Sequence, residues 1–224
     1  MSKGKTILVS RNLKTNSPLR NWAIENEHSL IELPFIRIDP LVDVEIPETD
    51  WVFFSSPNGL DIYFKYYPLL AQKIGVYGEG TNSRLKRLGM EANFVGDTTK
   101  TPAEIGQEFF NSISSNASVL FPQSQLSKKS IVGLNKVNDC IQKVVYETGL
   151  EASEIHEVDI AILSSPSNID GFLLKNKVRD TTFVVLGETS KNHFKSLGLT
   201  DKIEVPESAS EEAVILLLEK LLLK

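Results

Sequence analysis

Residues 50–58 read DWVFFSSPN, and the same pattern returns as DIAILSSPS at residues 159–167. A second motif, GEGT at residues 78–81, returns as GETS at residues 187–190. In both cases the second copy follows the first by 109 residues. The constant spacing indicates a duplicated unit in which a short apolar strand leads into a polar turn and then into a helix.

The same alternation of short apolar runs and helical stretches extends along the rest of the chain. The expected strands are residues 6–9, 30–34, 51–54, 74–77, 93–95, 118–121, 141–146, 159–163, 183–186 and 203–205. The expected helices include residues 17–27, 57–64, 81–88, 101–113 and 126–136, and a last one that begins at Ser208 or Ser210. Short strands that alternate with helices predict parallel sheets covered on both faces. We therefore predict an α/β fold with two similar lobes, each a parallel sheet flanked by helices.

The composition is that of a globular protein with a small negative charge. The 224 residues are 41% hydrophobic and 24% charged, and 24 basic residues against 29 acidic ones give a formal charge of −5. This balance disfavours nucleic acid as a partner, because neutralising phosphates requires a basic face. A small anionic ligand remains compatible with the composition if its cationic partners are concentrated locally.

No segment of the sequence is expected to enter a membrane. The apolar runs at residues 213–218 and 221–223 are separated by Glu219 and Lys220, and together they are far shorter than the ~20 residues that a membrane span needs. The single cysteine, Cys140, cannot form an internal disulfide, which fits a reducing compartment. We expect a cytoplasmic protein.

The polar turns after the duplicated strands are the best candidates for a binding site. In open parallel sheets, ligands bind beyond the carboxyl ends of the strands. Helix N-termini at these ends carry free N–H groups and a partial positive charge, which attract carboxylates or phosphates. A single serine turn of this kind can equally serve only to cap its helix. The candidate residues in these turns are Ser55, Ser56, Asn58, Gly78, Thr81, Ser165, Ser167, Gly187 and Thr189.

Other motif-based functions find little support. Gly78 and Gly80 have the spacing that begins a dinucleotide-binding motif, but Ser83 stands in place of the third glycine. The sequence contains no phosphate-binding P-loop and no Gly-x-Ser-x-Gly nucleophile motif. His28, His156 and His193 lack the spacing of metal ligands, so we expect no metal site.

Taken together, several short motifs make this chain similar to the uroporphyrinogen-III synthase family. These are Val9-Ser10-Arg11, the two Ser-Ser-Pro turns, and the glycine–threonine turns whose helices end in Leu-Gly. Residues 144–148 and the closing strand–Pro206–helix segment also fit. The resemblance extends over nearly the whole chain, and it is carried by the order and spacing of the motifs.

The resemblance implies two lobes, the first of which is discontinuous in sequence. Residues 1–34 and 151–224 would form one α/β domain, and residues 40–144 would form the other. Residues 35–39 and 145–150 would be two extended linker strands between them. The repeat alone is equally compatible with two contiguous halves.

The resemblance also implies a reaction, namely the cyclisation of the linear tetrapyrrole hydroxymethylbilane with inversion of the last pyrrole ring and loss of water. No cofactor is implied. Tyr146 matches a family tyrosine and would donate the proton that releases water, although its ring can also serve only to pack between the linkers. Ser10, Arg11 and the turn residues would bind the substrate carboxylates, and Arg11 can alternatively form an ion pair with a neighbouring residue.

Departures from the usual family pattern keep a second hypothesis open. Ser10 replaces a more usual threonine, Lys191 replaces a small residue, and residues 122–125 read PQSQ. These changes are compatible with a non-catalytic, two-lobed paralogue that binds an anionic ligand or serves a regulatory role. For either function we expect a monomer, and the unstable substrate of the enzyme would favour a transient contact with the enzyme that supplies it.

Overall fold

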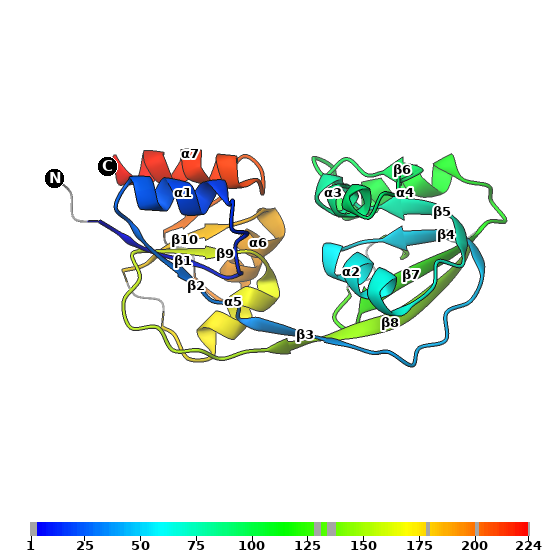
Figure 1. The fold of residues 1–224 in the computed structure, drawn as a ribbon, viewed down its shortest axis with the longest axis horizontal. Helices are drawn as coiled ribbons and strands as arrows, with labels where there is room; N and C mark the ends of the chain where they lie inside the picture. Colours follow the sequence, from blue (N-terminus) through cyan, green and yellow to red (C-terminus); the bar gives the residue numbers. More distant parts are fainter. Residues whose placement is uncertain (1–3, 128–130, 134–137, 178–179, 200–201, 224) are drawn as a thin grey trace. The chain divides into compact units, whose positions relative to one another are not determined.

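The computed structural model describes residues 4–127, 131–133, 138–177, 180–199 and 202–223 (Figure 1). The chain divides into two compact units, Met1–Arg37 with Gly149–Lys224 as unit 1 and Ile38–Thr148 as unit 2. Both divisions fall inside strands, namely β3 (Ile36–Pro40) and β8 (Asp139–Leu150), which are neighbours in one sheet. The fold is of the α/β class, with two mostly parallel sheets flanked by helices.

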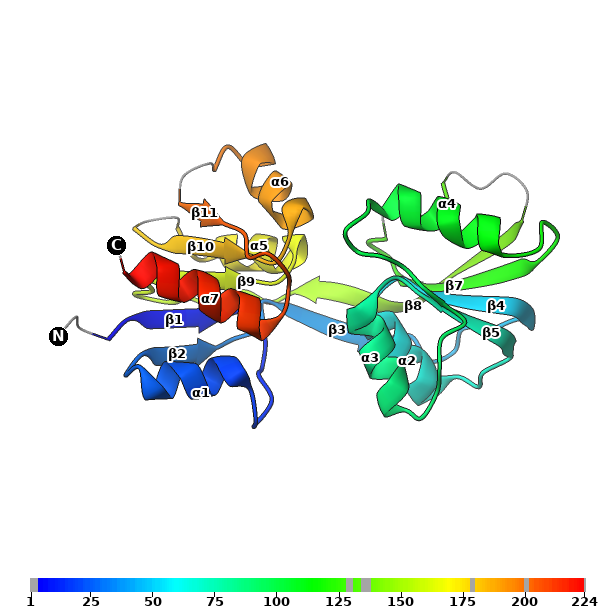
Figure 2. The same cartoon turned by 90° about the horizontal axis from the view of Figure 1, so that it is seen from above.

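Unit 1 contains a parallel sheet in the order β11-β10-β9-β1-β2. Its strands are β1 (Thr6–Val9), β2 (Ser29–Glu32), β9 (Ile160–Leu163), β10 (Thr182–Val185) and β11 (Ile203–Glu204). Its helices are α1 (Pro18–Glu25), α5 (Pro166–Leu173), α6 (Glu188–Ser196) and α7 (Glu211–Leu222). Ile7 and Val9 pack in the core beneath α1 and α7, whereas Leu8 packs with α5 and α6 (Figures 1 and 2). The alternation along β1 therefore builds two apolar layers, one on each face of the sheet.

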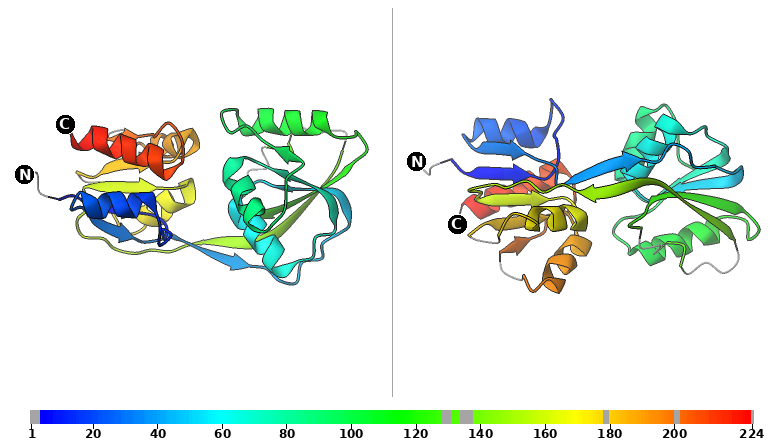
Figure 3. Two further views of the ribbon diagram at one scale, coloured as in Figure 1. Left: turned by 45° about the horizontal axis from the view of Figure 1, so that its top comes forward. Right: turned by 90° about the horizontal axis from the view of Figure 1, so that it is seen from below.

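Unit 2 contains a second sheet in the order β3-β8-β7-β4-β5-β6. Its remaining strands are β4 (Thr49–Phe54), β5 (Ala71–Val76), β6 (Phe94–Val95) and β7 (Ser118–Ser124), and its helices are α2 (Pro57–Tyr66), α3 (Glu79–Arg87) and α4 (Pro102–Ser112). Helices α2 and α3 cover one face, where Val52 and Phe54 are buried, and α4 covers the other, where Phe53 is buried (Figure 3).

Four helices begin at caps that preserve the repeat of the sequence. The side chains of Ser56 and Ser165 accept hydrogen bonds from the third residue beyond them, at 3.0 and 3.3 Å, and so start α2 and α5. Thr101 forms the predicted capping box of α4, and Ser210 caps α7. The members of each pair lie 109 residues apart, so the duplication extends to the helix starts.

The aspartates that open each copy of the first motif fix the pairing of strands. The Asp50 carboxylate accepts the backbone N–H of Ser118 at 2.8 Å, and the Asp159 carboxylate accepts that of Thr6 at 2.8 Å. The backbone and side-chain hydrogen bonds from Ser118 hold the pKa of Asp50 below its usual range. These aspartates lie at the amino ends of the strands, at the opposite edge of the sheet from the polar turns.

The predicted helix at residues 126–136 is wrong for the residues that the structure describes. Residues 125–126 and 131–133 form turns, and residues 128–130 and 134–137 lie outside the described part of the chain. Ile131 packs on α4 so closely that a Cβ added at Gly106 would lie 2.7 Å from the Ile131 carbonyl oxygen. Ile131 therefore lies in a turn that packs against α4.

None of the helices within the described residues combines the length and the apolar character needed to cross a bilayer.

Candidate functional site

The sheet of unit 1 has a switch point between β1 and β9, because the chain proceeds from β9 outward to β11 and from β1 outward in the other direction. Ligands of open parallel sheets bind outside the carboxyl ends of the strands at such a point. Here the Ser10 Oγ accepts the backbone N–H of Ser164 at 2.9 Å and lies 3.1 Å from the Ser164 Oγ. Ser10 is only 2% exposed, so its hydroxyl fastens the two strand ends together.

Asn168 completes the polar network at this switch point, and the sequence analysis missed it. Its side-chain nitrogen donates to the Oγ atoms of Ser165 and Ser164 at 3.0 and 3.2 Å, and its oxygen accepts the backbone N–H of Phe35 at 3.3 Å. The corresponding residue of the first copy is Gly59. This break in the repeat was the signal that the two Ser-Ser-Pro turns have different surroundings.

In unit 2, the space beside Gly59 is used by Tyr146. A Cβ added at Gly59 would lie 3.7 Å from Tyr146 Cε1 and 3.1 Å from the carbonyl oxygen of Pro122. The Tyr146 hydroxyl lies 3.0 Å from the Ser56 Oγ at the N-terminus of α2. Since the Ser56 Oγ already accepts the Gly59 N–H, its own hydrogen can be donated to the tyrosine oxygen. The phenolic hydrogen of Tyr146 is then available to another acceptor.

Burial keeps the Tyr146 phenol in its neutral form. The residue is 5% exposed, and this burial raises the pKa of Tyr146, although the hydrogen bond with Ser56 opposes the rise. Burial raises the pKa of such a group because the charged form is poorly solvated in the protein. At neutral pH the group is therefore a proton donor.

The two glycine turns use glycine for different reasons. Gly78 has extended backbone angles, but a Cβ there would lie 2.2 Å from the Thr98 Cγ2. Gly187 has open space around it, but its φ of 127° is one that side-chain-bearing residues rarely adopt. The duplicated motif therefore does not produce equivalent surfaces.

Accessibility also differs between these turns. Thr81 is 3% exposed and Gly78 is buried, whereas Thr189 is exposed and Gly187 is half-buried. The candidate residues at the start of α6 are thus accessible to a ligand, whereas Gly78 and Thr81 at the start of α3 are buried. Of the remaining candidates, Ser55, Asn58 and Ser167 are half-buried at the starts of α2 and α5.

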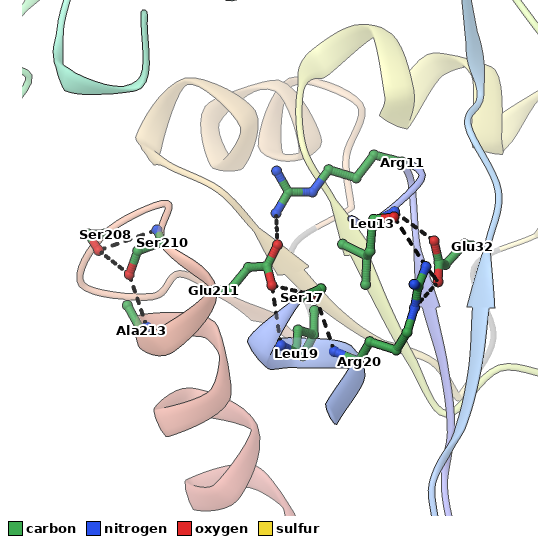
Figure 4. Close-up of polar contacts among 10 residues, drawn as sticks. All are labelled: Arg11, Leu13, Ser17, Leu19, Arg20, Glu32, Ser208, Ser210, Glu211 and Ala213. Atoms are coloured by element: carbon green, nitrogen blue, oxygen red, sulfur yellow. Dashed lines mark hydrogen bonds and ion pairs between the residues drawn. The ribbon is translucent and has the colours of Figure 1, made fainter. Parts of the chain in front are cut away.

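Arg11 directly follows Ser10 and is exposed. Its guanidinium forms an ion pair with Glu211, the first residue of α7, with 3.2 Å between Nη2 and Oε1 (Figure 4). The alternative role considered for Arg11, an ion pair with a neighbour, is therefore present in the structure. The described residues contain no group of three or more His, Cys, Asp or Glu side chains that could hold a metal ion.

A hollow of about 750 Å³ lies at the other edge of the sheet of unit 1, where β1 and β9 begin. It is lined by three lysines, one histidine and four carboxylates, and one of these carboxylates, Asp159, is paired with Lys5 at 2.9 Å. None of the candidate turn residues lines it. Its four carboxylates make it a poorer site for an anion than the helix N-termini at the carboxyl edge.

Comparison with known proteins gives consistent results. A family model described as uroporphyrinogen-III synthase HemD matches residues 23–215. The porphyrin biosynthesis protein HemD of Ruminiclostridium josui is 23% identical over 95% of this chain and 47% of that protein. The chain thus spans about half the length of this relative.

Two crystal structures resemble the fold along its length. Uroporphyrinogen-III synthetase from Helicobacter pylori gives a TM-score of 0.70 at 17% identity, covering 97% of this chain and 99% of that one. A mutant uroporphyrinogen III synthase from Thermus thermophilus gives 0.60 at 12% identity, covering 98% and 99%. At these identities the likeness establishes the fold alone.

Proposed function

The chain belongs to the uroporphyrinogen-III synthase family, and we propose that it converts hydroxymethylbilane to uroporphyrinogen III with inversion of the last pyrrole ring and release of water. The observation that carries this proposal is the buried, neutral Tyr146, whose hydroxyl is oriented by Ser56 3.0 Å away. We place the activity in the cytoplasm and assign it to a monomer that needs no cofactor.

The substrate brings eight carboxylates, and helix N-termini can bind them without lysine or arginine side chains. The accessible turn residues are the proposed contacts: Ser55, Ser56, Asn58, Ser165, Ser167, Gly187 and Thr189. Gly78 and Thr81 are buried, and Thr98 lies against Gly78, so these two residues are weaker candidates for direct contact with the substrate. Ser10 supports the contacts by holding the ends of β1 and β9 together.

The chemistry requires one proton donor and careful positioning. Tyr146 would protonate the terminal hydroxyl group, which leaves as water and generates an electrophilic azafulvene. The last ring would attack through its substituted carbon, and the resulting spiro intermediate would fragment and reclose. The ring carbon that forms the final bond loses a proton, which returns the tyrosinate to its neutral form, so the net release is one water molecule.

Selectivity between the two ring-closure modes costs little energy. The unassisted closure gives the type I isomer without inversion, so the protein must mainly favour one closure over the other. A tenfold preference corresponds to only about 1.4 kcal/mol of differential transition-state stabilisation. Holding the ends of the substrate in a suitable geometry can supply that amount.

A non-catalytic, anion-binding paralogue is the second candidate, and the burial of Gly78 and Thr81, two of the proposed substrate contacts, favours it. The two are distinguished by incubating the purified chain with freshly generated hydroxymethylbilane and separating the oxidised type I and type III products. We expect type III product. Type I alone, from folded protein that still binds uroporphyrin III, would instead establish the binding protein.

A further inference from the structure

The carboxylate of Glu211 occupies an anion-binding position that the protein itself fills. Figure 4 shows it at the N-terminus of α1, where it accepts the backbone N–H of Leu19 at 3.2 Å and the hydroxyl of Ser17. The same carboxylate, through its other oxygen, pairs with Arg11 at 3.2 Å. A helix N-terminus, a hydroxyl and a guanidinium are groups that can also bind the carboxylate of a ligand.

The two sides of this ion pair differ in how firmly they are held. Glu211 is 20% exposed as a side chain and is anchored by two hydrogen bonds that do not involve Arg11. The Arg11 side chain is 44% exposed. If Arg11 turned to another anion, the Glu211 carboxylate would lose its ion pair but keep its hydrogen bonds from Ser17 and Leu19.

We propose that Glu211 is a positioning residue that holds Arg11 beyond the carboxyl end of β1 and competes with a substrate carboxylate for its guanidinium. This inference rests on the proposed function, because it assumes that the ligand is a polycarboxylate bound at this edge. The internal carboxylate lowers the affinity of Arg11 for the ligand, which favours release of a product carrying the same eight carboxylates. It also keeps Arg11 close to its binding pose before the ligand arrives.

A neighbouring ion pair provides a matched control. Arg20 donates from Nε and Nη2 to Glu32 at 3.0 and 2.6 Å, and Glu32 also accepts the backbone N–H of Leu13 at 2.6 Å (Figure 4). These bonds connect Leu13 and Arg20, which lie on either side of Ser17, to the end of β2 and do not involve Arg11. Glu32→Gln therefore tests the effect of loosening the loop, and Glu211→Gln tests the effect of freeing Arg11.

The experiment measures the dissociation constant of uroporphyrin III, a stable octacarboxylate, by fluorescence titration of the full chain at fixed low salt. Glu211→Gln is expected to bind uroporphyrin III about threefold more tightly, because it removes a partly exposed ion pair that competes for Arg11. Arg11→Gln is expected to bind about tenfold more weakly. In the Arg11→Gln background, Glu211→Gln is expected to change nothing, and Glu32→Gln is expected to leave the wild-type affinity unchanged. Where turnover is measurable, Glu211→Gln should lower KM without raising kcat.

Two results would overturn the competition. The first is that Glu211→Gln binds uroporphyrin III as weakly as wild type or more weakly. The second is that Glu211→Gln also changes the affinity in the Arg11→Gln background, because this would show that Glu211 has a purely structural role. Failure of the proposed function gives a different pattern: the wild-type chain binds uroporphyrin III and responds to Glu211→Gln, but it forms no type III product. Absence of any binding by wild type would reject the competition, whereas the proposed function would still be decided by the type III assay.

Discussion

Replacing Tyr146 by phenylalanine removes one oxygen atom and leaves the buried ring in place. The lost hydrogen bond to Ser56 should cost about 1 kcal/mol of the free energy of unfolding, the usual net value of such a bond. Ser56 would still cap α2 through the N–H of Gly59. We therefore expect Tyr146→Phe to fold and to keep its affinity for uroporphyrin III.

The expected effect on catalysis is much larger than the effect on folding. Proton donation by a positioned side chain typically contributes a factor of about 10² to 10⁴, and a factor of 10² corresponds to about 2.7 kcal/mol. If Tyr146 is the donor, kcat should fall at least about a hundredfold while KM changes little, since the binding turns are untouched.

The assay is the initial rate of type III formation, with the spontaneous type I closure measured in the same samples. Tyr63→Phe is the matched control, because Tyr63 is fully buried in the same apolar cluster and has no assigned role in the site. Undiminished type III formation by Tyr146→Phe would remove this residue from the mechanism. Equal losses in the two variants would attribute the effect to packing.

The structure yields three further predictions. Gly171→Ala should destabilise unit 1 by about 3 kcal/mol in chemical denaturation, because the new Cβ would lie 2.1 Å from the carbonyl oxygen of Phe35; an unchanged denaturation midpoint would show that the backbones separate easily. Gly187→Ala should cost about 1–3 kcal/mol through its φ of 127° alone, and wild-type stability would contradict the strained angle. Burial raises the pKa of Asp159, but the hydrogen bonds from Thr6 and Lys5, together with the positive charge of Lys5, outweigh it and lower the pKa. The contribution of Asp159 to the stability of the fold is therefore present above the ordinary aspartate pKa of about 3.9 and is lost as pH falls through the lower folded value. Asp159→Asn should therefore lose less stability than wild type between pH 5 and pH 2, and parallel pH profiles would contradict this assignment.

Much of the fold followed from local patterns in the sequence. The capping box at Thr101 and the Ser-Ser-Pro turns at residues 55–57 and 164–166 are recognisable because a cap and its helix lie within a few residues of each other. The constant spacing of the repeat then related the two halves. These features need no knowledge of distant contacts.

The features that escaped the sequence analysis depend on such contacts. Nothing near Gly78 in the sequence indicates that Thr98 covers it, or that Glu211 reaches Arg11 from the other end of the chain. Nothing in the sequence indicates that Ile131, inside the predicted helix at residues 126–136, instead lies in a turn against Gly106 of α4. The replacement of Gly59 by Asn168 was visible, but its meaning required the position of Tyr146.

The proposal that this protein directs ring closure is tested most directly by the partition of hydroxymethylbilane between the two isomers at increasing protein concentration. Spontaneous closure proceeds at a fixed rate, so a synthase should raise the type III fraction steadily until nearly all of the substrate follows the enzymatic route. A type III fraction that does not change with the concentration of folded protein would contradict the account.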